Sequence, residues 1–449
     1  MKILITAASG LVGKALVTEL QIQGHEVFAL VRNPQKVVGL NPNNVYLWDK
    51  DTSLTTNAIS GKDVVINLAG EGIADKPWTT KRKKQLRSSR LDTTRNLVKS
   101  ITSIPESHRP KVFISASAIG IYGEDAGKIF DESWPAGKGF LAELCTEWEE
   151  TTKIEEHYNV RVVNMRLGII LSKNGGFLRK MAPVILGNGN QWISWVHISD
   201  VVRFVNEAIS NPSFKGPYNL TSPEPIKNSD LTRVYSKKMG FPFVMRTPEK
   251  ILKLVLGEMA SVVIASQRVL ANRLLRTGFN FEFNSFQGAL DNIYGNDNFL
   301  DNYHNADQFI PLPKDKVFHF FSLAENLEQI TPPWLNFKIT HKSADKIAEN
   351  ILIDYKLKIH GIPVKWRTRI SKWQPDELFV DEQLKGPYTK WYHVHSFHDV
   401  AGGTLIRDDV TFRVPGSIIG KWLLTPFIRK DVEAIFSYRQ KIIGQLHKK

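Results

Sequence analysis

The chain of 449 residues contains one cysteine, Cys145. A single cysteine excludes a disulfide framework within the chain and fits a reducing compartment, so we expect a cytoplasmic protein. No apolar run is long enough to span a bilayer, because the best candidate, 251–265, is interrupted by Lys253 and Glu258. The N-terminus lacks the basic, apolar and small-residue order of a signal peptide. We therefore expect no integral membrane segment.

Basic residues exceed acidic ones by 59 to 45, which gives a net charge of +14. Such a surface attracts nucleic acid or anionic membranes. No basic stripe with interleaved aromatic residues is present, so the sequence does not favour nucleic-acid binding. A generally basic proteome together with a site for a phosphorylated cofactor is the alternative explanation of the excess. The hydrophobic fraction of 42% is that of an ordinary globular protein, and the length predicts two or three domains.

Short apolar runs alternate with helical stretches through the first third of the chain. Helices are expected at 12–23 and 78–104. This alternation predicts an α/β domain with a doubly wound parallel sheet. Expected strands are 2–7, 26–31, 45–48, 63–69, 111–115 and 160–170.

The pattern changes twice in the rest of the chain. Helices expected at 231–240 and 249–275 indicate a small mixed lobe, and the polar, turn-rich segment 295–307 reads as a linker. Apolar and polar residues then alternate with period two from Ile351 to Ile359, which is typical of a strand with one buried face. A curved antiparallel sheet closed by a C-terminal helix would enclose a cavity. Further strands are expected at 378–384, 391–399 and 404–414, and the helix at 431–446.

The turn after the first strand has the pattern of a phosphate-binding turn. Gly10 permits close approach of a pyrophosphate to the helix N-terminus, and Gly13 permits close packing of helix on strand. Ala7 stands where this pattern usually has its first glycine. Its methyl group is tolerable if φ is negative. A purely structural turn is the alternative.

The end of the second strand distinguishes the two nicotinamide cofactors. NAD-binding proteins usually carry an acid there for the ribose 2′-hydroxyl. This chain reads Leu30-Val31-Arg32-Asn33-Pro34 and has no acid. Arg32 can pair with a 2′-phosphate, so the sequence favours NADP(H). A solvated surface arginine is the other interpretation.

Several ordered motifs resemble the atypical extended short-chain dehydrogenase/reductases, the "NAD-dependent epimerase family proteins" that are sometimes misnamed cell-division inhibitors. The segment 257–281 is similar to that family's small C-terminal module of unknown function. The resemblance spans 1–297. It is carried by VVINLAGEGIADKPWTTKRKKQLRSSRLDTTRNLV (64–98), SASAIGIYG (115–123), FLAELCTEWE (140–149), RLGIIL (166–171) and GNGNQWISWVHISD (187–200).

The resemblance implies cofactor contacts at matching positions. The turn would cradle the pyrophosphate, Arg32 would meet the 2′-phosphate, and two residues at the end of the fourth strand would line the ribose. Two arginines would act as polar clamps, with a glutamine nearby. The implied set is Ala7, Ser9, Gly10, Leu11, Val12, Gly13, Arg32, Leu68, Ala69, Gln85, Arg90 and Arg166.

The usual acid–base residues of that superfamily are a serine and a Tyr-x-x-x-Lys pair. Ser117 fills the serine position, but the segment 140–145 holds neither tyrosine nor lysine. Tyr122 is the remaining tyrosine candidate, although its Ile-Tyr-Gly segment is commonly structural. Cys145 on an apolar helical face reads as core. His197 and Asp200 are expected to hold the loop and the lobe together.

The C-terminal motifs resemble the START-like (SRPBCC) ligand-binding superfamily, a helix-grip fold around an apolar cavity. His393, His395 and His398 raise the question of a metal site. His393 and His395 share a strand face, but spacing does not fix a third ligand, so we expect ordinary hydrogen bonds and no metal. Asp381, Glu382 and Gln383 are candidate polar contacts for a ligand, and a solvated strand face is the alternative. The motifs are FHFFSLAENLEQITPPWLNFKI (318–339), HGIPVKWRTRISKW (360–373), FVDEQLKGPYTKWYHVH (379–395) and GGTLIRDDVTFRVP (402–415).

Two functions remain open at this stage. The first is an NADP(H)-binding oxidoreductase or epimerase that acts on an unidentified small molecule, with a fused domain for an apolar ligand. The second is a non-enzymatic protein that senses NADPH and acts by binding a ligand in its C-terminal cavity. The expected divisions are a Rossmann-type domain at 1–230, a small lobe at 231–297, a linker at 298–310 and a helix-grip domain at 311–449.

Overall fold

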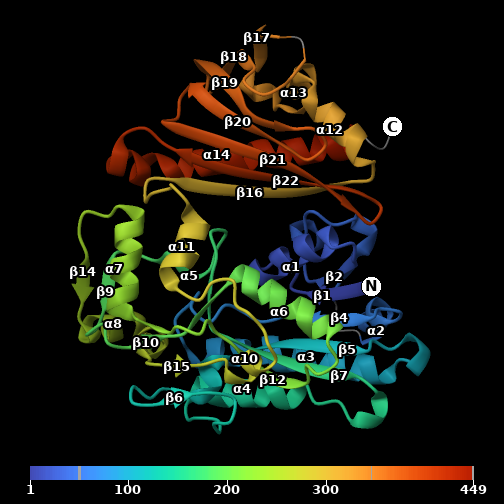
Figure 1. The fold of residues 1–449 in the computed structure, drawn as a ribbon, viewed down its shortest axis with the longest axis vertical. Helices are drawn as coiled ribbons and strands as arrows, with labels where there is room; N and C mark the ends of the chain where they lie inside the picture. Colours follow the sequence, from blue (N-terminus) through green and yellow to red (C-terminus); the bar gives the residue numbers. More distant parts are fainter. Residues whose placement is uncertain (49–51, 345, 447–449) are drawn as a thin grey trace. The chain divides into compact units, whose positions relative to one another are not determined.

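The computed structural model describes residues 1–48, 52–344 and 346–446. The chain separates into two compact units (Figure 1). The first consists of Met1–Glu19, Glu26–Val37 and Asn44–Asn298, and the second of Leu20–His25, Val38–Asn43 and Phe299–Lys449. Within the described ranges, the helices lack the length and apolar character that crossing a membrane requires.

A seven-stranded parallel sheet forms the centre of the first unit, as the strand–helix alternation predicts. Its strands are buried and rich in Val, Ile and Leu, because helices cover both faces of such a sheet. A seventh strand, β12 (Gly216–Leu220), pairs with β7 and was not expected. The strand order is β12-β7-β5-β4-β1-β2-β3, with β1 Lys2–Thr6, β2 Glu26–Val31, β3 Val45–Leu47, β4 Val64–Asn67, β5 Val112–Ala118 and β7 Arg161–Leu167.

The strand order reverses between β1 and β4. In a doubly wound sheet, ligands bind outside the carboxyl ends of the strands at this point. The surrounding helices include α1 (Leu11–Ile22), α3 (Thr80–Ser103), α4 (Phe140–Thr151) and α6 (Ile198–Ser210). Their apolar residues pack on the sheet, as in the buried cluster that joins Leu4, Phe113 and Leu97. The topology therefore directs attention to the residues after β1 and β4.

The small lobe departs from the sequence prediction. Its first helix, α7 (Asn228–Met239), lies close to the expected range. The prediction of one continuous helix over 249–275 is wrong. Gly257 has a φ of +57° and ends the first piece. A short strand within the range pairs with residues 129–130 instead of continuing the helix. The pieces are α8 Glu249–Leu256, α9 Ala260–Ile264, β15 Arg268–Val269 and α10 Asn272–Arg276.

The second unit contains a seven-stranded antiparallel sheet, as the period-two pattern predicts. The prediction of a linker is wrong over β16 (Asn302–Ile310), because this segment pairs along its whole length with β22. Strands β17 and β19 were also not expected. The order is β16-β22-β21-β20-β19-β18-β17, with β17 Lys338–Lys342, β18 Leu352–Ile359, β19 Ile362–Gln374, β20 Leu378–Lys385, β21 Lys390–Val400 and β22 Gly403–Arg413.

Helices close one face of this sheet. The long helix α14 (Ser417–Leu446) begins earlier than the predicted start at residue 431 and contains Pro426. With α12 (Lys314–Ser322) and α13 (Ala324–Ile330) it encloses a cavity of about 520 Å³ against the sheet. The second unit is thus a helix-grip fold with an internal cavity.

Candidate functional site

The turn between β1 and α1 leaves no room for a side chain at Gly13 and little at Gly10. A Cβ on Gly13 would lie 2.4 Å from the carbonyl oxygen of Ala7, and one on Gly10 would lie 3.2 Å from the same oxygen. The Gly10 N–H donates to that carbonyl at 2.9 Å. Ala7 itself has a φ of +52°, so the negative φ considered for it is not adopted. Its methyl group is held in a left-handed conformation that glycine would adopt without strain.

This turn has the features of an anion site. Helix α1 is 12 residues long and has no acidic residue in its first turn. Its first backbone N–H groups have no partner within the helix and carry the positive end of the helix dipole. A pyrophosphate fits such a cradle, because only a backbone without Cβ atoms allows the close approach. Ser9, Leu11 and Val12 belong to the same turn and helix start.

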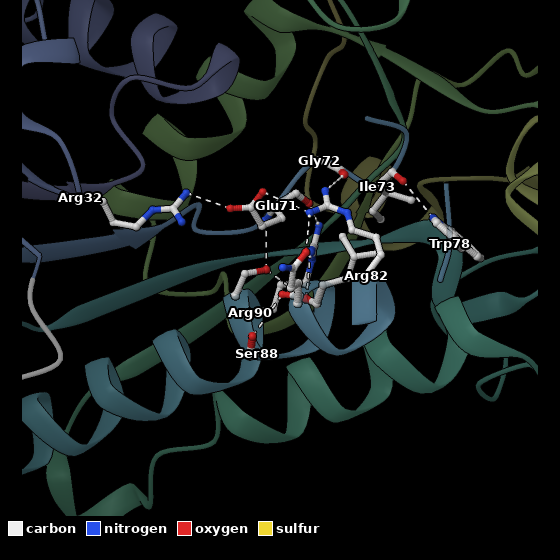
Figure 2. Close-up of polar contacts among 11 residues, drawn as sticks. Arg32, Glu71, Gly72, Ile73, Trp78, Arg82, Ser88 and Arg90 are labelled. Carbon is white, nitrogen blue, oxygen red and sulfur yellow. Dashed lines mark hydrogen bonds and ion pairs between the residues drawn. The ribbon is translucent and has the colours of Figure 1, made fainter. Parts of the chain in front are cut away.

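Arg32 lies directly after β2 and points toward Glu71 (Figure 2). Its Nη2 donates to Glu71 Oε1 at 3.0 Å, and its side chain is 77% exposed. The hydrogen bond from Arg32 lowers the pKa of Glu71, and Arg82 adds to the effect. The expected partner of Arg32 is a 2′-phosphate, but within the protein that place is taken by the Glu71 carboxylate. An exposed pair of this kind is weak and easily exchanged for another anion.

Two buried arginines of α3 hold the segment that follows β4. Arg82 Nη2 donates to the carbonyl of Gly72 at 2.7 Å, and Arg90 Nη2 donates to that of Glu71 at 2.9 Å. Arg90 also lies over the ring of Trp148, at 5.2 Å from its centre, and burial lowers its pKa. Gln85 is exposed on the same helix and accepts a long contact from Arg82. Arg90, expected as a cofactor clamp, is thus directed at backbone carbonyls.

A buried amide links residues of three strands. Asn67 donates to Thr94 at 3.0 Å and to Ser115 at 3.2 Å, and its oxygen accepts from Thr6 at 3.0 Å. The N–H of Ala69 also donates to this oxygen, and the N–H of Leu68 donates to Thr6. Leu68 and Ala69 are half-buried at the sheet edge where the ribose is expected. The sequence reading missed Asn67, since nothing separates it from other polar strand ends.

Ser117, Glu149 and Arg166 form a second network. Ser117 Oγ donates to Glu149 at 2.6 Å, and Arg166 donates to both Glu149 oxygens at 2.8 Å. Burial by itself lowers the pKa of Arg166, but the hydrogen bond and charge of Glu149 raise it overall. Glu149 was missed because α4 carries several glutamates with no feature to separate them. Arg166, expected as a cofactor clamp, is here the partner of Glu149.

Tyr122 belongs to the same network. Its hydroxyl donates to Asn219 at 2.7 Å and accepts from Arg166 at 2.8 Å. Burial raises the pKa of Tyr122 to about 12. The proton of this hydroxyl is therefore held by Asn219 near neutral pH. These contacts favour a supporting role for Tyr122 over that of a general acid.

Helix α4 occupies the place of the missing Tyr-Lys pair. Cys145 on this helix is 4% exposed and packs in a cluster with Ile119, Tyr122 and Val269. Burial raises the pKa of the Cys145 thiol to about 12, so the thiolate is scarce at neutral pH. The thiol is thus a core group, as the sequence indicated.

His197 and Asp200 hold the start of α6 and the lobe. His197 Nδ1 accepts from the N–H of Ser199 at 3.2 Å and caps the helix. Asp200 is fully buried and accepts from the backbone N–H groups of Glu282 and Phe283 at 2.7 and 3.3 Å. These bonds give both residues the structural role that the sequence indicated.

The helix-grip unit has its own candidate site. Aromatic side chains line the cavity, with Trp366 and Trp391 packed edge to face at 5.5 Å. Asp381, His393 and His395 line the cavity as well, so the structure brings these three together. His398 is not part of this group and contacts Ser396 instead.

Three family models match successive parts of the chain. Residues 3–221 match the NAD dependent epimerase/dehydratase family. Residues 247–293 match a domain of unknown function, DUF1731. Residues 310–435 match the model described as polyketide cyclase / dehydrase and lipid transport. The first two lie in the parallel-sheet unit, and the third lies in the helix-grip unit.

Curated relatives and solved structures match about 65% of the chain's length. The chloroplastic homolog of epimerase family protein SDR39U1 from Arabidopsis thaliana is 36% identical over 299 residues, which cover 65% of this chain and 86% of that protein. The epimerase family protein YfhF of Bacillus subtilis is 31% identical over 65% of this chain and 98% of its own length. The human epimerase family protein SDR39U1 (isoform 2), crystallised with NADPH, is 27% identical. It has a TM-score of 0.60 and covers 65% of this chain and 99% of its own.

Proposed function

This chain belongs to the epimerase family, with a polyketide cyclase/lipid transport domain fused to it, and on that premise we propose that it is an NADP(H)-dependent oxidoreductase or epimerase. One observation carries the cofactor choice: the residue after β2 is Arg32, and residues 30–34 contain no acid for a ribose 2′-hydroxyl. The crystallised human relative holds NADPH, which supports the same choice.

The residues present fit this cofactor. The turn of Ala7 to Gly13 would hold the pyrophosphate on backbone N–H groups, and Arg32 would exchange Glu71 for the 2′-phosphate. Leu68 and Ala69 would line the ribose at the end of β4. When bound, the nicotinamide ring supplies or accepts hydride.

The protein's own acid–base pair would be Ser117 and Glu149. Because Ser117 Oγ donates to Glu149, its lone pairs are left to accept a hydrogen bond from a substrate hydroxyl. A proton from that hydroxyl would pass to Ser117 as the serine proton passes to the Glu149 carboxylate. Arg166 holds this carboxylate in place through two hydrogen bonds. Tyr122, in turn, holds Arg166 and positions the pair.

Thermal stabilisation by the two cofactors tests the binding proposal. NADPH is expected to raise the melting temperature more than NADH, because only NADPH carries the phosphate for Arg32. Arg32→Ala should weaken NADPH binding by about 10- to 100-fold, the value of one or two charge-assisted hydrogen bonds, and leave NADH unchanged. Arg95→Ala, on the exposed side of α3, is the matched control. Equal stabilisation by both cofactors would overturn the 2′-phosphate assignment.

The alternative is a protein that binds NADPH without turning it over. The absence of tyrosine and lysine from residues 140–145 favours this alternative. Oxidation of NADPH against a panel of aldehydes and ketones separates the two functions. Turnover that Ser117→Ala abolishes supports the enzyme. Tight NADPH binding without turnover of any compound supports the sensor, whose ligand would then occupy the helix-grip cavity.

A further inference from the structure

Four ionisable side chains stand together on the inner face of the antiparallel sheet. Asp381 lies on β20 opposite His393 on β21, and His395 on β21 lies opposite Asp408 on β22. His393, His395 and Asp408 are 5%, 3% and 6% exposed. The rest of the cavity wall is mainly aromatic and aliphatic. Burying charged groups in such surroundings costs free energy, so a group of four calls for a purpose beyond stability.

We propose that Asp381, His393 and His395 bind a divalent transition-metal ion, Zn²⁺ or Fe²⁺, at the wall of this cavity. Each residue offers one ligand atom, and these atoms all lie within 4.8 Å of one another. Two imidazoles and one carboxylate form a donor set that suits both ions. The two histidines are i and i+2 on one strand, so both project from the same face of the sheet.

Asp408 has the place of a supporting carboxylate. His393 Nε2 lies 3.1 Å from Asp408 Oδ1, and His395 Nδ1 lies 2.6 Å from the same oxygen, although the second contact is too bent to count as a hydrogen bond. Metal-ligating histidines usually direct their second ring nitrogen to such a carboxylate. Asp408 therefore leaves His393 Nδ1 and His395 Nε2 to the ion.

The third proposed ligand, Asp381, lies beside the ring nitrogen of His395 that does not face Asp408. His395 Nε2 is 3.3 Å from Asp381 Oδ2. The ring nitrogen that does not contact Asp408 therefore already lies next to a carboxylate. Asp381, His393 and His395 line the cavity, whereas Asp408 does not. The ligands thus face the cavity and the supporting group lies behind them. Three protein ligands leave at least one coordination position open toward the cavity, where an oxygen of a bound apolar molecule fits.

The competing occupant of the site is a proton. A proton shared by His395 with Asp381 and Asp408 would satisfy the same atoms without a metal. Arg439 of α14, whose Nε has no hydrogen-bond partner, also lines this cavity and balances one of the two carboxylates. With both imidazoles neutral, the two carboxylates and Arg439 carry a net charge of −1, which favours a cation at the site. A site occupied by a shared proton and a site occupied by a metal ion give different results in the following experiment.

The experiment measures metal binding by the full-length chain. Wild-type protein, stripped with a chelator, is titrated with Zn²⁺, with Fe²⁺ under anaerobic conditions, and with Co²⁺ as a spectroscopic probe. We expect one equivalent per chain and visible Co²⁺ absorption bands typical of nitrogen and oxygen ligands. Comparing the Zn²⁺ and Fe²⁺ affinities, together with the metal content of the protein as purified, identifies the resident ion.

Variants locate the site. Asp381→Asn and His395→Gln should each abolish stoichiometric binding, and Asp408→Asn should weaken it by about 10- to 100-fold, as is usual for a supporting carboxylate. His398→Gln, on the opposite face of the same strand, is the matched control and should bind as wild type. Circular dichroism confirms folding of each variant.

Two outcomes would overturn the site. The first is wild-type protein that takes up no equivalent of Zn²⁺, Fe²⁺ or Co²⁺, which leaves the shared proton as the occupant. The second is binding that persists unchanged in folded Asp381→Asn and His395→Gln, which places the metal elsewhere. The wild-type titration needs no variant to fold, and it is independent of the cofactor proposal because it involves the helix-grip unit alone.

Discussion

Glu149 of α4 and Arg166 of β7 are joined by two hydrogen bonds of 2.8 Å each, and the Arg166 side chain is only 10% exposed. Glu149→Gln leaves the guanidinium buried without its counter-charge. Removing one partner of a buried pair costs about 3–5 kcal/mol, so the free energy of unfolding should fall by this amount in urea titrations.

The matched control is a pair on the surface of α3. Asp92 and Arg95 are 64% and 59% exposed, and Asp92→Asn removes the same charge. Exposed pairs contribute about 0–1 kcal/mol, so this variant should differ little from wild type. Equal losses in the two variants would show that Glu149 and Arg166 do not stabilise each other.

A second prediction concerns the strained turn. Because Ala7 has a φ of +52°, Ala7→Gly relieves about 1–2 kcal/mol of backbone strain in the folded protein. Glycine also gives the unfolded chain more conformational entropy, which lowers the stability by about 0.4–1 kcal/mol. The free energy of unfolding should rise by about 0.5–1 kcal/mol. Ala8→Gly, at a position only 2% exposed and outside the positive-φ set, should lower it. A loss of stability in both variants would contradict the strain at Ala7.

The parallel sheet was predictable because its strands are buried on both faces and read as continuous apolar runs. β12 was missed, since its sequence GPYNL contains glycine, proline and asparagine. The prediction of a linker at β16 fails for the same reason: NYHNADQFI is rich in turn-forming residues, and only its pairing with β22 makes it a strand. Tertiary pairing overrode local propensity in both cases.

The candidate sites show the same division between local and non-local information. The turn at Gly10 and Gly13 and the candidate cofactor residue Arg32 follow from local spacing. Glu149 comes together with Ser117 only in the folded chain, and Asp381 reaches His393 only through strand register. Spacing in the sequence carries neither relationship, so the second network and the third ligand could not be predicted.

A third prediction follows from the pKa of His197, which burial lowers to about 4. The imidazole is neutral in the folded protein, and its Nδ1 accepts the Ser199 N–H, so protonation breaks the helix cap. The unfolded histidine binds a proton below about pH 6.5. His197 therefore contributes its full stability above about pH 6.5, and about 3 kcal/mol is lost progressively as the pH falls to 4.

The measurement compares the free energy of unfolding of His197→Asn and wild type between pH 7 and 4. Asparagine can still cap the helix but does not titrate, so the difference between the two proteins should change across this range. His108→Asn, at an exposed position of the same unit, removes a histidine without removing a helix cap and is the matched control. A constant difference between His197→Asn and wild type would contradict the lowered pKa.

The fourth prediction uses the contact between Arg32 and Glu71 to test how the 2′-phosphate is bound. If the phosphate replaces Glu71 on Arg32, then Glu71→Gln removes both the competing anion and its repulsion of the phosphate. The exposed pair is worth up to about 1 kcal/mol, so the NADPH dissociation constant should fall about two- to fivefold in calorimetric titrations. NADH binding should stay the same.

Asp75→Asn is the matched control, because it removes an equal charge from the same segment. Asp75 pairs with Lys180 and not with Arg32, so the NADPH affinity of this variant should match wild type. Tighter binding of both cofactors to Glu71→Gln, or of NADPH to Asp75→Asn, would mean that general charge governs affinity and that Arg32 does not select the phosphate.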